Sequence, residues 1–67
     1  MGEELRNRLR EERAKRELTQ AQLADLVGVS RKTINTVENG VFIPSTVLAL
    51  RLAAALKTTV ESLFKLP

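Results

Sequence analysis

The sequence contains no cysteine, no histidine, no tryptophan and no tyrosine. Without cysteine and histidine there can be no disulfide, no thiolate or imidazole metal site and no zinc finger. The absence of histidine also removes the commonest general base of enzymes. The two aromatic residues, Phe42 and Phe64, are too few for the stacking surfaces that bind single-stranded nucleic acids.

Features of membrane proteins and enzymes are missing as well. No apolar run is long enough to cross a bilayer, and the N-terminus is charged, so we expect neither a membrane span nor a signal peptide. The sequence has no glycine-rich phosphate loop, and Thr19, Ser30 and Thr59 are better explained as helix caps than as nucleophiles. We therefore expect a cytoplasmic protein without enzymatic activity, metal, cofactor or membrane partner.

Length and charge narrow the possibilities further. The 67 residues predict one domain, residues 1–67, with a thin core, because a chain this short buries only about 60% of its unfolded surface. The net charge of +3 favours a polyanionic partner, although many small soluble proteins are also mildly basic. With disulfides excluded, self-association is the remaining way to add stability.

Two short helices joined by a tight turn are predicted between Thr19 and Gly40. The first begins at Thr19, where Gln22 completes a Thr-x-x-Gln capping box. It ends at Gly28, because glycine adopts the left-handed conformation of a helix C-terminus at little cost. Ser30 can cap the second helix.

The second of these helices has one apolar face and one polar face. Ile34 and Val37 point inward at helical spacing. The residues left outside are Arg31, Lys32, Thr33, Asn35 and Thr36. A helix with exposed donors and cations, braced by another helix across a glycine turn, is suited to the major groove of double-stranded DNA.

The remaining segments predict three more helices and no strand, so the fold class is all-α. The first helix runs from about Glu3 to Arg16, with Leu5 and Leu9 one turn apart on its apolar side. Its charged residues are most simply explained as a solvated face with pairs such as Glu11–Lys15.

The C-terminal third predicts two helices after a loop that Gly40 and Pro44 bracket. Ser45 caps a fourth helix, Thr46 to Leu56. Leu50 lies outside the apolar stripe that this helix is predicted to bury. A last short helix, capped by Thr59, ends near Leu63 or Phe64.

Several residue types at fixed spacings carry a resemblance to a known family. They are Arg13, Leu18-Thr19-Gln20, Leu23-Ala24, Gly28-Val29-Ser30, Ile34, Glu38-Asn39-Gly40, Pro44-Ser45 and Leu56. On these residues the chain resembles the Cro/CI-type helix-turn-helix family, also called the XRE family, from Leu5 to Phe64. The resemblance implies a compact five-helix bundle of the lambda-repressor-like fold, with the helix-turn-helix at residues 19–40. Most members bind operator DNA as dimers.

The resemblance also implies roles in DNA binding. The residues expected to face base edges are Arg31, Lys32, Thr33 and Thr36. The residues expected to contact phosphates or position the helix are Gln20, Ser30, Asn35 and Asn39. Arg31 or Lys32 would address guanine O6 and N7. Alternatively, both are solvated cations or phosphate contacts that read no base.

Arg13 and Glu38 match a pair that bridges the first and third helices in the family. A guanidinium can hold a carboxylate through two hydrogen bonds and so fix the tilt of the recognition helix. The role implied for this pair is therefore structural, and the alternative is two unrelated surface charges.

Some positions depart from the family pattern. Glu17 stands where glycine is common, so either the turn there is tighter or the first helix is longer. Glu12 replaces an apolar residue, and Lys57 replaces a glycine or asparagine at a helix end, where a cation suits the dipole. The apolar segment 41–43 replaces basic residues, which weakens the case for a minor-groove contact.

An apolar surface predicts self-association. The residues that form it are Val41, Phe42, Ile43, Leu50, Phe64 and Leu66. They offer more exposed apolar surface than a monomer of this size needs, so we expect a symmetric dimer with recognition helices about 34 Å apart. Alternatively, Phe42 and Phe64 complete the core of the monomer.

Two functions follow from the sequence. The first is a transcriptional regulator, a repressor that binds a near-palindromic operator as a homodimer and is associated with the nucleoid when bound. The second is an antitoxin or adaptor whose main partner is a protein, bound through the exposed apolar loop.

Overall fold

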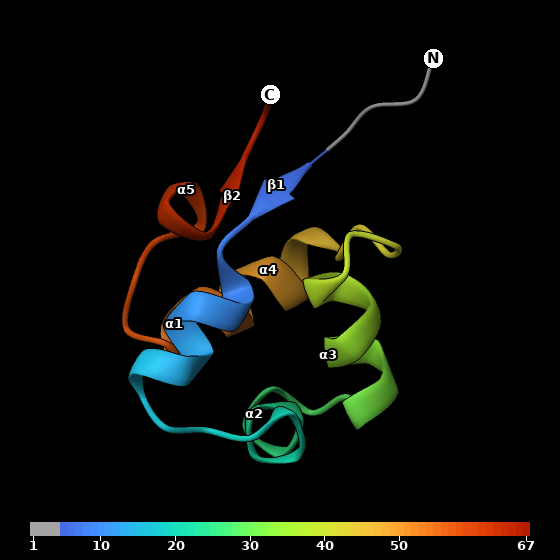
Figure 1. The fold of residues 1–67 in the computed structure, drawn as a ribbon, viewed down its shortest axis with the longest axis vertical. Coiled ribbons are helices and arrows are strands. Elements are labelled where there is room, and N and C mark those ends of the chain that lie inside the picture. Colours follow the sequence, from blue (N-terminus) through green and yellow to red (C-terminus); the bar gives the residue numbers. More distant parts are fainter. Residues whose placement is uncertain (1–4) are drawn as a thin grey trace.

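The computed structural model describes residues 5–67, and within them the chain forms five helices and one two-stranded antiparallel ribbon. The helices are α1 (Leu9–Lys15), α2 (Gln20–Val27), α3 (Arg31–Glu38), α4 (Thr46–Ala55) and α5 (Val60–Leu63). The strands are β1 (Arg6–Asn7) and β2 (Phe64–Lys65). Figure 1 shows the ribbon at one end of the molecule and α2 at the opposite end. The predicted five-helix fold is confirmed.

The ribbon corrects the prediction that the chain has no strand and that its first helix begins near Glu3. Glu3 lies outside the described residues, and α1 begins at Leu9. From Leu5 to Leu9 the side chains alternate between inward and exposed positions, which is the period of a strand. The spacing of four residues between Leu5 and Leu9 fits both a helix and a strand. The apolar pattern alone could not separate the two.

Asn7 fastens the ribbon to two helices. Its Oδ1 atom accepts the N–H of Leu9 at 3.1 Å, where α1 begins. Its Nδ2 atom donates to the carbonyl oxygen of Val37 at 3.1 Å, near the end of α3. In the ribbon Asn7 lies opposite Phe64. One side chain therefore joins the start of α1, the end of α3 and the ribbon.

The N-termini of the four later helices are capped as predicted. Thr19, Ser30, Ser45 and Thr59 each accept a hydrogen bond from the backbone N–H three residues further on. The capping box at Thr19 is complete, since Gln22 Oε1 also accepts the Thr19 N–H at 2.8 Å. A cap of this kind contributes about 1 kcal/mol, which explains why these helices begin where the sequence predicts.

Left-handed residues end four of the helices. Gly28 and Gly40 have φ angles of 77° and 75°, which glycine adopts at little cost. Glu17 and Lys57 adopt the same conformation, each at φ 55°, where a side chain costs roughly 1–2 kcal/mol. The Glu17 N–H donates to the Ala14 carbonyl oxygen at 2.9 Å, so the turn after α1 is tight. The alternative of a longer first helix is wrong.

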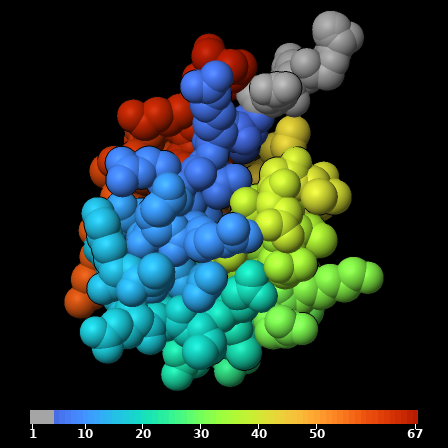
Figure 2. Space-filling view, in the orientation of Figure 1, coloured from blue at the N-terminus to red at the C-terminus, as the bar shows by residue number. Residues whose placement is uncertain are grey.

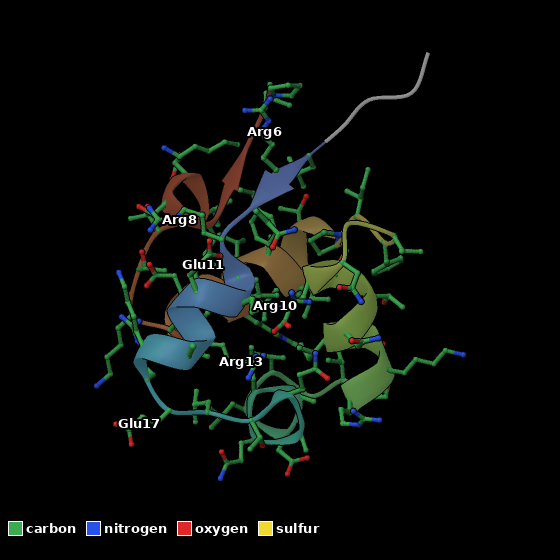
Figure 3. The ribbon with its side chains drawn as sticks, in the orientation of Figure 1. Arg6, Arg8, Arg10, Glu11, Arg13 and Glu17 are labelled. Carbon is green, nitrogen blue, oxygen red and sulfur yellow. The ribbon has the colours of Figure 1, made fainter. Side chains whose placement is uncertain are left out.

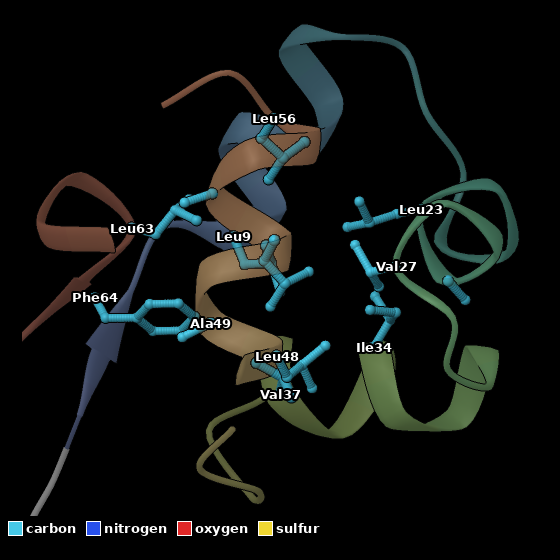
Figure 4. Packing of buried hydrophobic residues seen from close by; sticks show 13 residues of the cluster. Leu9, Leu23, Val27, Ile34, Val37, Leu48, Ala49, Leu56, Leu63 and Phe64 are labelled. Atoms are coloured by element: carbon cyan, nitrogen blue, oxygen red, sulfur yellow. The ribbon is translucent and has the colours of Figure 1, made fainter. Parts of the chain in front are cut away.

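The buried side chains form one hydrophobic core, drawn in Figure 4. They include Ile34 and Val37, the two residues of α3 predicted to point inward. Phe64 is 8% exposed and belongs to this core, so its prediction as an exposed interface residue is wrong. Phe42, at 46% exposed, stays outside it. Within residues 5–67, no helix is long and apolar enough to cross a membrane.

Candidate nucleic-acid interface

The recognition-helix candidate, α3, presents one polar face to solvent. Arg31, Lys32 and Asn35 are exposed, whereas Thr33 and Thr36 are half-buried. The Thr36 hydroxyl donates to the Thr33 carbonyl oxygen at 2.9 Å. The side chains of Arg31 and Lys32 therefore extend furthest into solvent. Those of Thr33 and Thr36 lie closer to the helix axis on the same face.

Ser30 holds the first turn of α3. Its Oγ atom accepts the N–H of Thr33 at 3.1 Å and lies 3.0 Å from the Thr33 hydroxyl. The Ser30 oxygen is thus engaged in capping the helix. Its predicted role in positioning α3 has a structural basis in this cap, and a direct phosphate contact stays a prediction.

A partly buried ion pair joins α1 to the end of α3. Arg13 Nε lies 2.6 Å from Glu38 Oε2, and Arg13 Nη2 donates to Glu38 Oε1 at 3.2 Å. The Glu38 side chain is 0% exposed and that of Arg13 is 16% exposed. Arg13 Nη1 also donates to the Leu18 carbonyl oxygen at 2.8 Å. This bidentate contact between guanidinium and carboxylate fixes the separation and tilt of α1 and α3.

Glu38 accepts hydrogen bonds from two further side chains. Gln20 Nε2 donates to its Oε1 atom at 3.1 Å, and Arg10 Nε donates to the same atom at 3.4 Å. Burial raises the pKa of the Glu38 carboxyl, but the hydrogen bonds from Arg13 and Gln20 and the charge of Arg13 outweigh it. The net result is a pKa below the ordinary value, so Glu38 is ionised at neutral pH.

On the solvent side of this pair, side-chain hydrogen bonds link residues of α1, α2 and α3 to Asn39. Arg10 Nη2 donates to Asn39 Oδ1 at 2.7 Å, and Asn39 Nδ2 donates to Asn35 Oδ1 at 3.3 Å. Gln20 Nε2 donates to the same Asn35 oxygen at 3.2 Å, and Arg31 Nη1 donates to Gln20 Oε1 at 3.4 Å. We call these five residues the surface network. It brings together three predicted positioning residues and one predicted base-reading residue.

Arg10 is the member of the surface network that the sequence analysis missed. It is one of the charged residues of the first helix, which the sequence predicts to form a solvated face, but it lies three residues before Arg13 and on the same side of α1. Figure 3 shows Arg10 and Arg13 directed toward α3, with Arg8 and Glu11 on the other side of α1. Figure 2 shows α1 and α3 in contact on this face. The spacing of the two arginines was the signal that could have found it.

Other charged residues of α1 form different ion pairs from the one predicted. Lys15 lies 3.3 Å from Glu12, not against Glu11, and Arg16 lies 3.0 Å from the same Glu12 carboxylate. The Glu12 residue that replaces an apolar family residue is thus paired within its own helix.

A second surface is apolar. Its large exposed side chains are Val41, Phe42, Ile43, Val47, Leu50 and Leu66, whereas Leu26, which is also exposed, belongs to α2. Five of these were predicted as interface residues, and Val47, which lies one turn before Leu50 on α4, was missed. A groove of about 320 Å³ lies beside one of them, Leu50, and Pro44 and Val60 are among its other lining residues. Buried Phe64 contributes part of its surface to this groove.

Comparison with known proteins identifies the architecture. The chain matches the model of the helix-turn-helix family over residues 9–63. It belongs to the Cro/CI-type helix-turn-helix family. An HTH-type transcriptional regulator of Archaeoglobus fulgidus is 45% identical over 60 residues, which cover 90% of this chain and 86% of the relative. The HTH-type transcriptional regulator YgzD of Bacillus subtilis is 36% identical over 60 residues, covering 90% and 91% of the two chains.

Solved structures of helix-turn-helix proteins resemble the fold closely. The restriction-modification controller protein C.AhdI from Aeromonas hydrophila has a TM-score of 0.78 and 40% identity, covering 82% of this chain and 83% of that one. The clp gene regulator ClgR from Corynebacterium glutamicum has a TM-score of 0.74 and 31% identity, covering 78% and 55%. The FeII protein HppE is similar over only 31% of its own chain, at 27% identity and a TM-score of 0.74.

Proposed function

We propose that this protein is a sequence-specific regulator of transcription, a repressor that binds a near-palindromic operator in double-stranded DNA as a homodimer. The observation that carries the proposal is the exposed polar face of α3, held at a fixed tilt by the partly buried Arg13–Glu38 pair. Its relatives from Archaeoglobus fulgidus and Bacillus subtilis are named as transcriptional regulators. Such a regulator works in the cytoplasm, at the nucleoid when bound to DNA.

In this proposal the two halves of the interface have different tasks. Arg31, Lys32, Thr33 and Thr36 read base edges in the major groove, and the two cations address guanine O6 and N7. Contacts to phosphates orient the protein but carry no sequence information. The residues assigned to them are Gln20, Ser30, Asn35 and Asn39.

The first experiment is selection of bound sequences from a random duplex library at two salt concentrations. Enrichment of a near-palindrome with half-sites about one helical turn apart is the expected result. Binding that vanishes with salt and enriches no sequence would contradict it, because that is the behaviour of phosphate attraction alone.

Two substitutions assign base readout. Arg31→Ala or Lys32→Ala should lower affinity for the selected site by about 1–3 kcal/mol and relax the preference at one base position. Lys57→Ala, which removes an exposed cation after α4, is the control and should leave the preference unchanged. A variant of Arg31 or Lys32 that weakens all sequences equally would reassign that residue to phosphate binding.

The homodimer rests on the apolar surface, through Val41, Phe42, Ile43, Leu50 and Leu66. Sedimentation at micromolar concentration should show a dimer, and Leu50→Glu should shift it to monomer. Leu26→Glu is the matched control, since Leu26 is 62% exposed and Leu50 57%, but Leu26 lies on α2. A wild type that sediments only as monomer would contradict the dimer.

A second candidate function is an antitoxin or adaptor with a protein as its main partner. The same apolar surface favours it, because a surface of this kind can bind a different chain. A toxin-like reading frame beside the gene, together with failure to select a DNA sequence, would move this candidate to first place.

A further inference from the structure

The charges around Glu38 do not balance. Its single carboxylate has two guanidinium partners, Arg13 Nε at 2.6 Å and Arg10 Nε at 3.4 Å. Arg13 is the closer and the more buried of the two, and its two hydrogen bonds are enough to compensate the carboxylate. Arg10 is therefore a surplus cation, and its side chain is 59% exposed.

The second partner of Arg10 leaves that surplus charge in place. Arg10 Nη2 donates to Asn39 Oδ1 at 2.7 Å, and a carboxamide oxygen is a neutral acceptor. A guanidinium has five N–H donors, and these two contacts use two of them. Three donors of a half-exposed, oriented guanidinium thus remain for an acceptor from outside the chain.

The position of Arg10 indicates which acceptor fits. Arg10 lies on α1 beside the C-terminal end of α3, whereas the predicted base-reading residues begin at the N-terminal end of α3. Its neighbour Asn39 is itself assigned to a phosphate in the proposed function. A planar fork of donors matches the geometry of a phosphate group, and phosphates outside the groove are contacted from elements other than the recognition helix.

We infer that Arg10 is a further phosphate-binding residue of the DNA interface, held ready by Glu38 and Asn39. This inference rests on the proposed function, since it needs duplex DNA as the ligand. Because the guanidinium is already fixed by two hydrogen bonds, little side-chain freedom is lost when a phosphate binds. The contact contributes to binding of every sequence and to the preference for none.

The test is the salt dependence of duplex binding, measured by fluorescence anisotropy with the selected site and with an unrelated duplex. For Arg10→Gln we expect the slope of log affinity against log salt to fall by about 0.9, the release of one counterion. At about 0.1 M salt this is a loss of roughly five- to tenfold in affinity, equal for both duplexes. Arg10→Lys should restore most of the slope.

Lys15→Gln is the matched control. Lys15 lies on the same helix, is 62% exposed and also pairs with a glutamate, Glu12. Five residues after Arg10, it points about 140° away around the helix axis. Lys15→Gln should leave the slope unchanged, although it removes the same charge. Equal losses in Arg10→Gln and Lys15→Gln would overturn the inference, because net charge would then explain both.

Thermal melting separates a lost contact from a lost fold. Arg10→Gln should melt within a few degrees of the wild type, because Arg13 remains on Glu38. A normal slope in a well-folded Arg10→Gln variant would overturn the inference and leave the proposed function intact. A wild type that binds every duplex alike would refute sequence-specific regulation but would still report the slope difference. A wild type that binds no duplex would overturn both.

Discussion

Glu12 and Glu38 have the same chemistry in two different places. Each carboxylate accepts hydrogen bonds from two cationic side chains. The partners of Glu12 lie one turn further along the chain: Lys15 is the last residue of α1, and Arg16 follows it. The cationic partners of Glu38 come from a different helix, α1, which contacts the end of α3. The Glu12 cluster connects residues that are neighbours in one helix, so it stabilises that helix only locally. The Glu38 cluster connects two helices, so it fixes their relative position.

The pKa values follow different causes in the two clusters. The hydrogen bond from Lys15 is the largest influence on the pKa of Glu12 and lowers it below its ordinary value. Burial comes second and raises this pKa, while the hydrogen bond from Arg16 and the charges of Lys15 and Arg16 lower it further. For Glu38, burial is the largest single influence and raises the pKa, and the hydrogen bonds must overcome it. Glu38 therefore depends on its partners more strongly than Glu12 does.

The largest effect should come from breaking the cluster between the helices. Glu38→Ala leaves the Arg13 guanidinium, which is 16% exposed, without its carboxylate, at a cost of about 3 kcal/mol. For a domain of this size the midpoint of thermal unfolding should fall by more than about 10 °C. Arg13→Ala should also lower the midpoint of thermal unfolding.

The double variant Arg13→Ala/Glu38→Ala is the control for this prediction. Its loss should be smaller than the sum of the two single losses, because neither charge is then left alone. Single variants that melt like the wild type would show that the pair is two unrelated surface charges.

The pH dependence of stability should separate the two carboxylates next. The folded pKa of Glu38 is below its ordinary value of 4.5, so its stabilising contribution is present above pH 4.5. That contribution is lost as the pH falls through the folded pKa. Urea unfolding between about pH 7 and pH 3 should show this loss in the wild type, and Glu38→Gln should flatten the curve. An equally steep curve in Glu38→Gln would assign the acid sensitivity to other carboxylates.

A third carboxylate, that of Glu17, extends the comparison to a residue whose replacement should stabilise the protein. Glu17 has no ion pair among residues 5–67, and it holds the left-handed φ of 55°. Glu17→Gly should therefore stabilise the protein by about 0.5–1 kcal/mol, a gain of a few degrees in thermal melting. Ala54→Gly, on the exposed side of α4, is the control and should destabilise by about 1 kcal/mol. If both variants lost stability, Glu17 would contribute something other than strain.

The smallest effect should come from the cluster within α1. Glu12→Gln should cost no more than about 0.5 kcal/mol, since pairs three and four residues apart on a helix surface contribute little. Chemical denaturation at low and high salt measures it, and the difference from wild type should vanish at high salt. A loss as large as that of Glu38→Ala would remove the distinction between the two clusters.

Local chemistry made part of this structure predictable. A capping box, two glycine turns and the helical spacing of Ile34 and Val37 each involve residues a few positions apart, so the sequence alone located α2 and α3. The residue types at Arg13 and Glu38 indicated a bridge through family resemblance, not through spacing.

Contacts between distant segments set the limit of prediction. Arg10 has an identity typical of any solvated helix, and its place beside Asn39 depends on how α1 packs against α3. The ribbon was missed because Leu5 and Leu9 fit two periods at once. Phe42 and Phe64 could not be told apart by type, because burial of Phe64 requires the C-terminal segment to pair with β1.

The hydrogen bonds of Asn7 make the position of the recognition helix depend on segments that lie far apart in the sequence. Asn7 pairs with Phe64 in the ribbon and also donates to the Val37 carbonyl oxygen near the end of α3. If the ribbon opens, the link from Asn7 to α3 therefore loses its support from β2. A change at the C-terminal strand can in this way reach the end of the recognition helix without touching any residue of its polar face.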